Sequence, residues 1–590
     1  MGLSWPASAW DDAPGMTDHR AWFQSYPPAV PRTLEPYPDI SVFGMLEASA
    51  RSYPGATAIA WFGRKIAYAD LLREVERCSA ALAGVGVRRG DRVALVMPNC
   101  PQYLISYYAA ARLGAIAVGN NPLYTKREME HQLRDCGAKV VIVLDLLYSD
   151  FAEVFTGLGI EHVVVARLND HMPFPKKQLA PIVKFKKMQR EQGKPWPPVP
   201  KGAPVLRWEG WIRAAGPAPV APHMDTVRDA AAFVYTGGTT GVSKGAMISH
   251  RNLVANAMQG AAYLQLREGE EGLLGSLPFF HSFGMLVMNV AIRVAGKLIP
   301  IPNPRDLHIV LEEIDKEKPT FVPGVPRLFT ALNESPLVPK YDLRSVRACI
   351  SGGAPLPTAV AERFAQITGG ATLVEGYGLT EASPVTHANP LHGERRAGAI
   401  GLPVPDTDCK IVDLENPERA VAAGERGELC VRGPQVMLGY WNRPEETART
   451  IINGWLHTGD VAVMDPDGYF RIVDRLKELI IVSGFNVYPN EVEEVLYHHP
   501  KLSKAAVIGI PDERTGEAVK AFVVLKEGES ASPEEIMAWA RDPANGLTGY
   551  RVPKQIEFRD SLPETMIGKV LRRVLMEEER QKAAAGKPTS

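Results

Sequence analysis

Short apolar segments alternate with longer amphipathic ones through most of the first 400 residues. The run RVALVM at 92–97 precedes PQYLISYYAAARLG at 101–114, and KVVIVL at 139–144 precedes DLLYSDFAEVFTGLG at 145–159. Short runs rich in Val and Ile are typical of buried strands, whereas the longer segments have helical spacing. This alternation predicts βαβ units, in which helices cover the faces of parallel sheets.

The alternation ends near residue 401. Between 401 and 475, the strand-like segments KIVDLE, GELCVRG and GYFRIVD are separated by turns and not by long helices, which predicts a β-rich subdomain. After Lys477 a second α/β pattern begins, with the apolar runs ELIIVSG and AVKAFVVL and helical segments at 490–500 and 533–541.

These patterns predict an α/β protein with a large N-terminal domain of two α/β sheet layers plus the β-rich subdomain. A smaller, mobile C-terminal α+β domain follows. The expected domains are 16–475 and 476–590, and residues 1–15 are expected to be disordered because patterned sequence begins only after them. Asn490 and Glu493 are expected to form the N-cap and N3 pair of the first C-terminal helix.

Two uncharged stretches, 272–292 and 93–111, are long enough to be considered as membrane spans. The first contains Gly, Ser, Pro, His and Asn residues that a single lipid-exposed helix tolerates poorly. In the second, Pro98 and Pro101 separate a strand from a helix. Both stretches are therefore expected to be buried elements of a soluble protein.

The composition is that of a globular protein, with 590 residues of which 45% are hydrophobic and 23% are charged. The 66 basic and 67 acidic side chains leave a net charge of −1, so nucleic acid is not an expected partner. Six cysteines occur singly, without zinc-type Cys/His spacing, which favours a reducing, cytoplasmic location. The N-terminus has no basic start followed by an apolar core, so no secretory signal is expected.

The segment 171–200 is biased, with seven basic residues against the single acid Glu191. Apolar residues such as Phe174, Phe185 and Trp196 are interleaved with the lysines. One interpretation is a solvated excursion between two helices. The other is a peripheral contact with the anionic inner face of the cell membrane.

The stretch YTGGTTGVSKGAMISH at 235–250 has the composition of a phosphate-binding loop between an apolar strand and a helix. Glycines allow backbone N–H groups to converge on an anion, while hydroxyl groups and a lysine add donors and positive charge. It is not a Walker A loop, which requires Gly-Lys-Ser/Thr. The residues expected at the phosphates are Thr236, Gly237, Gly238, Thr239, Thr240, Gly241 and Lys244.

Four further motifs follow this loop: YGLTEASP at 377–384, HTGD at 457–460, YFRIVDRLKELIIVSGFNVYPNEVE at 469–493 and GKVLRR at 568–573. In this order the motifs resemble those of the adenylate-forming superfamily, which comprises acyl-CoA synthetases, luciferases and the adenylation domains of peptide synthetases. Flanking segments such as SYPPAVP and PQVMLGYWNRPEET resemble the bacterial long-chain fatty acyl-CoA ligases in particular, and the likeness covers nearly the whole chain.

The resemblance implies a ligase that uses ATP, Mg²⁺ and coenzyme A in two half-reactions. A long-chain fatty carboxylate attacks the α-phosphate of ATP to give acyl-adenylate and pyrophosphate, and the CoA thiol then displaces AMP. Alternatives are a medium-chain or aryl-acid CoA ligase, an acyl-AMP ligase that serves a carrier protein, or a non-catalytic lipid-binding module that uses the basic segment. Because family members are often dimeric, a homodimer is also expected.

The resemblance also implies roles at matching positions. Thr380 is expected at the α-phosphate and Glu381 at the Mg²⁺ ion, which prefers oxygen ligands. Asp460 and Arg475 are expected to hold the ribose. The nucleotide site is further expected to include Gly352, Gly353, Ala354, Pro355, Glu375, Gly376, Tyr377 and Gly378.

The C-terminal region is expected to serve both half-reactions. Lys569 is the predicted adenylation lysine, reaching from the small domain to the carboxylate and α-phosphate. Lys477 is the predicted hinge about which that domain rotates. After rotation, Gly484 and Phe485 are expected to face the pantetheine arm of CoA.

The segment LPFFHSFG at 277–284 resembles the family's acyl-tunnel segment. His281 is expected near the carboxylate end of the acyl chain and Phe283 close to it, with Gly353 contributing to the wall. The preferred chain length cannot be read from these residues.

Overall fold

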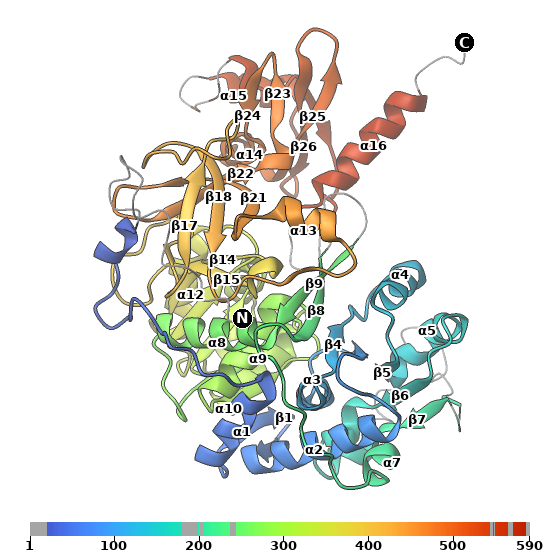
Figure 1. Cartoon of the computed structure of the whole chain (residues 1–590). Helices are drawn as coiled ribbons and strands as arrows, with labels where there is room; N and C mark the ends of the chain where they lie inside the picture. Colours follow the sequence, from blue (N-terminus) through green and yellow to red (C-terminus); the bar gives the residue numbers. More distant parts are fainter. Residues whose placement is uncertain are drawn as a thin grey trace.

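The computed structural model describes residues 20–179, 199–200, 202, 204–236, 243–542, 545, 547, 549–564 and 570–585. Figure 1 shows the two large sheets and their helices forming most of the molecule, with the C-terminal sheet at the opposite end from α1 and α2. The expected mixed α/β fold class, with large sheets and a smaller C-terminal unit, is confirmed.

The sheet that carries the phosphate-loop hairpin has eight strands in the order β19-β9-β8-β4-β3-β5-β6-β7. Strands from β8 to β7 are parallel to their neighbours, whereas β9 is antiparallel to both β8 and β19. The strands are β3 (Arg92–Val96), β4 (Ile116–Gly119), β5 (Val140–Leu144), β6 (His162–Ala166), β7 (Val205–Arg207), β8 (Ala230–Thr236), β9 (Lys244–Ser249) and β19 (Gly439–Tyr440).

The second large sheet has nine strands in the order β16-β15-β14-β13-β12-β10-β11-β1-β2. Its centre is parallel, and the antiparallel pairs lie at its two ends. The strands are β1 (Thr57–Trp61), β2 (Arg64–Ala67), β10 (Gly272–Gly275), β11 (Lys297–Pro300), β12 (Phe321–Gly324), β13 (Ala348–Ser351), β14 (Thr372–Gly378), β15 (Val385–Ala388) and β16 (Leu402–Pro403).

One continuous apolar core joins the two large sheets through the helices α1, α2, α3, α8 and α9. Every residue of α3 is buried, which explains why this helix carries no charge before Arg112. The helices of this region are α1 (Val42–Ser52), α2 (Tyr68–Gly84), α3 (Pro101–Leu113), α4 (Lys126–Cys136), α5 (Asp145–Gly157), α7 (Trp208–Arg213), α8 (His250–Tyr263), α9 (Ser282–Arg293), α10 (Leu307–Glu317), α11 (Pro326–Glu334) and α12 (Thr358–Thr368).

The two uncharged stretches are buried in this core. The first supplies β10 and most of α9, and the second supplies most of β3 and of α3. In the described part of the chain, no helix combines the length and the apolar character that crossing a bilayer needs.

The β-rich region forms a third, antiparallel sheet in the order β17-β18-β21-β20, with β22 also paired to β21. Its strands are β17 (Asp408–Val412), β18 (Gly427–Arg432), β20 (Ile451–Ile452), β21 (Trp455–Met464) and β22 (Phe470–Arg475), and it is accompanied by the short helix α13 (Pro444–Thr450).

The C-terminal sheet has the order β24-β23-β26-β25, with β27 parallel to β26. Its own core of aliphatic side chains lies between the sheet and its helices. The elements are β23 (Ile480–Val482), β24 (Phe485–Val487), α14 (Pro489–Tyr497), β25 (Leu502–Asp512), β26 (Gly516–Leu525), α15 (Pro533–Arg541), β27 (Gln555–Phe558) and α16 (Arg572–Ala585).

The expected capping pair of α14 is wrong. The helix has Tyr488 at its N-cap, and both Asn490 and Glu493 turn to the buried guanidinium of Arg572. The Nε of Arg572 donates to Glu493 Oε1 at 3.0 Å. A buried cation requires such partners, and this demand outweighs the local capping preference.

Several contacts connect α14 and its N-cap residue to the third sheet across the chain segment 475–478. The backbone N–H of Asn490 donates to Asp474 Oδ2 at 2.7 Å, and Arg426 forms an ion pair with Glu491 at 2.7 Å. The Arg426 guanidinium also lies 4.7 Å from the centre of the Tyr488 ring. These contacts fix the present orientation of the C-terminal sheet.

A backbone bridge between Gly401 and Phe470 joins the nine-stranded sheet to β22. Gly401 has φ +93°, and a Cβ there would lie 2.1 Å from the carbonyl of Ala388. Gly424 has φ +87°, but apart from its chain neighbours, no atom of the described residues lies within 4 Å of a Cβ placed there. Substitutions at these two glycines therefore distinguish the free-energy cost of a left-handed backbone alone from the cost of the same backbone together with a steric clash.

We expect Gly401→Ala to lower the free energy of unfolding by roughly 2–5 kcal/mol, because it combines strain with overpacking. Gly424→Ala should lower it by only about 1–2 kcal/mol. Urea unfolding followed by tryptophan fluorescence measures both values. Equal losses in the two variants would contradict the assigned clash.

Candidate active site

The phosphate-loop hairpin is held at both ends. Thr236 ends β8 and Lys244 begins β9, and the two residues are paired across the hairpin. The hydroxyl of Ser243 donates to the carbonyl of Thr236 at 2.8 Å. The remaining predicted loop residues, Gly237, Gly238, Thr239, Thr240 and Gly241, lie outside the described residues.

Lys244 forms an ion pair with Glu446 of α13 and lies over the ring of Tyr440, with 5.4 Å between Nζ and the ring centroid. Burial and the nearby positive charge of Lys477 lower the pKa of Lys244. A cation that is partly desolvated and close to a second cation favours an added anion. This environment suits the binding of phosphate.

The predicted α-phosphate and Mg²⁺ residues follow β14, in the short 3₁₀ turn Thr380–Ala382. The hydroxyl oxygens of Thr380 and Ser282 are 3.1 Å apart, and Tyr440 donates to Glu381 Oε1 at 2.6 Å. The negative charge of Glu381 acts on the pKa values of both Lys244 and Arg475. These side chains therefore belong to one charged cluster.

Asp460 lies on β21, and its side chain contacts residues of β14 and β22. Tyr377 donates to Asp460 Oδ2 at 2.5 Å, and Arg475 Nε lies 3.2 Å from Asp460 Oδ1. Burial, followed by the charge of Asp460, raises the pKa of Tyr377 well above its ordinary value, so the phenol is a donor at neutral pH. The three residues predicted around the nucleoside are thus brought into direct contact.

The predicted adenine wall lies beside the acyl segment. The loop Gly352 to Pro355 follows β13, and a Cβ at Gly352 would lie 2.8 Å from the ring of Phe283. Gly353 has φ +82°, a conformation that favours glycine. On the neighbouring strand β14, a Cβ at Gly376 would lie 2.6 Å from Ile350. The absence of side chains permits these close approaches.

Glu375 also lies on β14, together with Gly376, Tyr377 and Gly378. Its Oε2 accepts a hydrogen bond from the backbone of Leu356 at 3.1 Å. Burial raises the pKa of the Glu375 carboxyl to about 7.

The acyl segment begins α9. His281 is the N-cap residue, and its Nδ1 accepts a hydrogen bond from the backbone N–H of Phe283 at 3.4 Å. Burial lowers the pKa of His281, which keeps the imidazole neutral. An apolar cavity of about 30 Å³ lies behind this turn, with a lining that includes Phe283, Leu286, Val287, Phe321, Ile350 and Val404. This volume holds about one or two water molecules.

The C-terminal predictions are only partly placed. Lys477 lies in the 3₁₀ turn Leu476–Glu478 directly after Arg475, and its charge reaches Lys244. Gly484 has φ +83° in the β23–β24 turn, and Phe485, 57% exposed, stacks on Tyr550 with 4.9 Å between the ring centroids. No described contact connects Gly484 or Phe485 to the cluster that contains Asp460 and Glu381. Lys569 lies outside the described residues.

Two site residues were not identified from the sequence. Tyr440 and Glu446 come from the segment GYWNRPEET, which supported the family resemblance but received no role. Strand β19 pairs with β9 at Tyr440 and Ala246, and this pairing brings both residues to the phosphate loop. The motif could have drawn attention to these two residues, but the sequence does not indicate that β19 pairs with β9.

Two family models together match most of the chain. Residues 46–441 match the family model described as AMP-binding enzyme, and residues 491–569 match the AMP-binding enzyme C-terminal domain. The chain belongs to the AMP-binding enzyme family. This AMP-binding enzyme is 44% identical over 567 residues to a long-chain-fatty-acid–CoA ligase of Bacillus subtilis, covering 96% of this chain and 99% of that protein.

Relatives of this AMP-binding enzyme are named for more than one acid. A long-chain-fatty-acid–CoA ligase of Escherichia coli O157:H7 is 41% identical over 571 residues, covering 95% of this chain and 99% of that protein. A feruloyl-CoA synthase of an Amycolatopsis species is 36% identical over 525 residues, covering 89% and 96%. ATP-bound MatB from Rhodopseudomonas palustris superimposes with a TM-score of 0.78 at 29% identity, covering 92% of this chain and 99% of that one.

The raised pKa of Glu375 predicts a pH-dependent stability. Because the folded carboxyl holds its proton up to about pH 7 while the ordinary value is 4.5, protonation stabilises the fold. This stabilisation is lost as the pH rises from about 4.5 to about 7. We therefore expect Glu375→Gln to raise the melting temperature above that of the parent at pH 8.5, and less so at pH 5.5.

Thermal unfolding followed by circular dichroism at both pH values measures this effect. Glu362→Gln, at an exposed position of α12, is the matched control and should show no such pH-dependent difference. A Glu375→Gln effect of the same size at both pH values would rule out carboxyl ionisation as its cause.

Proposed function

We propose that this protein is an ATP-dependent long-chain fatty acid–CoA ligase, which forms an acyl-adenylate with release of pyrophosphate and then an acyl-CoA with release of AMP. The observation that carries the proposal is the 44% and 41% identity, over nearly the full length, to two long-chain-fatty-acid–CoA ligases. The charged cluster at the ends of the sheet strands supports it, since open α/β sheets bind ligands there.

In this proposal, Asp460 accepts hydrogen bonds from the ribose hydroxyls, and Arg475 holds the carboxylate in place. Tyr377, fixed through its hydroxyl, presents its ring toward the adenine together with the loop Gly352 to Pro355. The supporting observations are the 2.5 Å and 3.2 Å contacts of Asp460, which orient both partners before any nucleotide binds.

The phosphates are proposed to contact Thr236, Lys244 and Thr380, with the glycine and threonine residues of the loop around them. Glu381 fits Mg²⁺, because it offers a partly exposed carboxylate within the cationic cluster, and Mg²⁺ combines one or two carboxylates with phosphate oxygens. When bound, the ion neutralises phosphate charge. The side chains supply fixed charges that stabilise the α-phosphate as the carboxylate approaches.

The acyl chain is proposed to enter beside His281 and Phe283 and to extend along α9. Each buried methylene contributes about 0.8 kcal/mol, so a long apolar channel is the main source of affinity for a long chain. The cavity of about 30 Å³ behind Phe283 is far smaller than such a chain. Binding therefore requires side chains of α9 and β13 to move apart.

The C-terminal region, residues 476–590, is proposed to move as a domain against residues 16–475, with Lys477 as the hinge. Lys569 would serve adenylation, and Gly484 with Phe485 would face pantetheine in thioester formation. The two separate family matches, 46–441 and 491–569, support this division. In support of a passage there, no atom of the described residues beyond the chain neighbours lies within 4 Å of a Cβ placed at Gly484.

A peripheral contact with the inner face of the cell membrane is proposed through the segment 171–200, of which residues 180–198 lie outside the described residues. At its described start, Phe174 is 82% exposed and Leu179 is 50% exposed, next to Lys176 and Lys177. Exposed apolar side chains beside lysines suit an anionic lipid surface. A cytoplasmic location and a homodimer, both expected from the sequence, stay predictions.

An acid-panel assay tests the function. We expect pyrophosphate release with palmitate, much less with octanoate, benzoate or ferulate, and steady AMP release only when CoA is added. Release that is greatest with ferulate would favour the aryl-acid ligase, for which the feruloyl-CoA synthase is the relevant relative. AMP release with an acyl carrier protein but not with CoA would favour the carrier-loading enzyme, and no release with any acid would contradict a ligase.

Substitution of Lys569 tests the division between half-reactions. We expect Lys569→Ala to slow acyl-adenylate formation by ~10²-fold or more, since it removes the charge at the α-phosphate. Thioester formation from preformed acyl-adenylate should survive. Arg573→Ala, at an exposed position four residues later, is the control and should leave both rates near those of the parent. Equal losses in both half-reactions would refute the role.

A further inference from the structure

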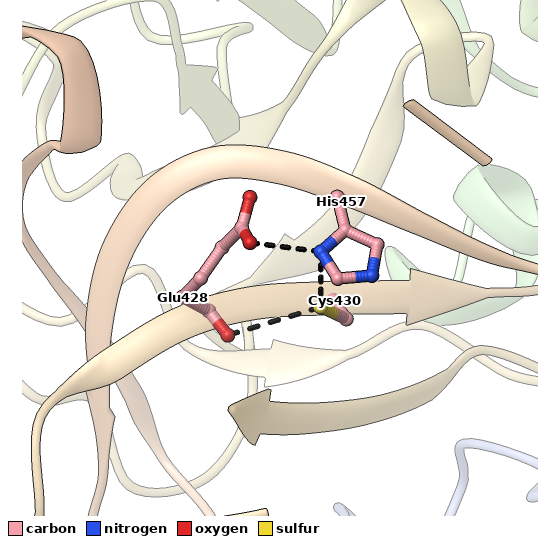
Figure 2. A group of neighbouring side chains, drawn as sticks. All are labelled: Glu428, Cys430 and His457. Carbon is pink, nitrogen blue, oxygen red and sulfur yellow. Dashed lines mark hydrogen bonds and ion pairs between the residues drawn. The ribbon is translucent and has the colours of Figure 1, made fainter. Parts of the chain in front are cut away.

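Three potential metal ligands converge on the third sheet, outside the cluster assigned to ATP. Figure 2 shows Glu428 and Cys430 on β18 turned toward His457 on β21. Cys430 and His457 are directly paired across the two strands. Their potential ligand atoms, one from each residue, all lie within 4.8 Å of one another.

Two of the three ligand separations lie within about 0.6 Å of those in a tetrahedral zinc site. His457 Nδ1 lies 3.4 Å from Cys430 Sγ and 2.8 Å from Glu428 Oε2. Usual zinc bond lengths to sulfur, nitrogen and oxygen place neighbouring tetrahedral ligands about 3.4–3.6 Å apart. The Cys–His pair already has this separation, and a carboxylate shift of about 0.6 Å opens the Glu–His pair to the same value.

The ligand types select the metal. Thiolate, imidazole and carboxylate together suit Zn²⁺ or a similar divalent transition ion, whereas Mg²⁺ and Ca²⁺ prefer oxygen alone. One thiolate and one carboxylate balance the two positive charges of the ion, and the imidazole binds in its neutral form. The resulting site is neutral, which suits its burial: Cys430 is 0% exposed, and the side chains of Glu428 and His457 are 12% and 11% exposed.

We propose that Glu428, Cys430 and His457 bind one divalent transition-metal ion of the zinc type, with a fourth position open to water. Binding forms a metal–sulfur bond and releases the thiol proton to solvent. The proton of His457 Nδ1 moves to Nε2, so that Nδ1 becomes the ligand. Lys410, paired with Cys430 from β17, places a positive charge near the thiolate.

The site is connected to the nucleotide cluster through one turn. Glu428 Oε1 accepts the backbone N–H of Gly459 at 2.9 Å, and Asp460 follows in the chain. A metal that holds Glu428 and His457 therefore fixes both ends of the turn before Asp460. This consequence rests on the proposed function, whereas metal binding itself does not.

Cobalt binding tests the site without reference to catalysis. Metal-free protein titrated with Co²⁺ is expected to bind one equivalent and to develop the near-ultraviolet absorption of a cobalt–thiolate bond, which added Zn²⁺ should abolish. Cys430→Ser should remove this band. Cys409→Ser is the matched control. Cys409 is buried, and its Sγ lies 3.5 Å from His387 Nε2, but among the described residues no carboxylate completes that pair, so the band should persist.

A second variant covers the case in which Cys430→Ser does not fold. Glu428→Gln should keep the cobalt–thiolate band but weaken Co²⁺ binding by ~10-fold or more, since it replaces an anionic ligand by a neutral one. Zn²⁺ should also raise the melting temperature of the parent protein and not that of Cys430→Ser. Absence of the band in the parent protein, or its persistence in Cys430→Ser, would overturn the proposal.

Discussion

The side-chain carboxylate of Asp460 holds the geometry on which the candidate site depends. Asp460 is 5% exposed, and a buried carboxylate requires a cation and hydrogen-bond donors nearby. Arg475 comes from the adjacent strand β22, whereas Tyr377 comes from β14 of the nine-stranded sheet. Since these partners belong to different sheets, the relative position of the three residues predicted around the nucleoside depends on the junction between the sheets, which the Gly401–Phe470 bridge also fixes.

Local patterns predicted much of the fold. The alternation of strand-like and helical runs identified β3 with α3 and β5 with α5, because strand and helix periodicities are properties of a few consecutive residues. The neighbours of each strand were beyond such reasoning. Strand β1, for example, pairs with β11, more than 200 residues later, and no local signal specifies that partner.

The same limit applies to the site. The motifs identified Asp460, Arg475, Tyr377 and Glu381, because each lies within a recognisable string of residues. They left Tyr440 without a role, since its hydrogen bond to Glu381 spans 59 residues. Likewise, the capping pattern at Asn490 and Glu493 failed because Arg572, about 80 residues away, competes for both side chains. Sequence spacing also hid Cys430 from His457, which only strand pairing brings together.

Non-covalent contacts, in addition to the chain itself, hold the C-terminal sheet against the third sheet. A swing about residues 475–478 would first have to separate Asn490 from Asp474, a side chain with no exposed surface, and Arg426 from Glu491. Water can replace the partner of the exposed pair at once, but it reaches the buried carboxylate only after the surfaces part. The proposed rotation would therefore be an all-or-none step between discrete orientations and not a continuous drift.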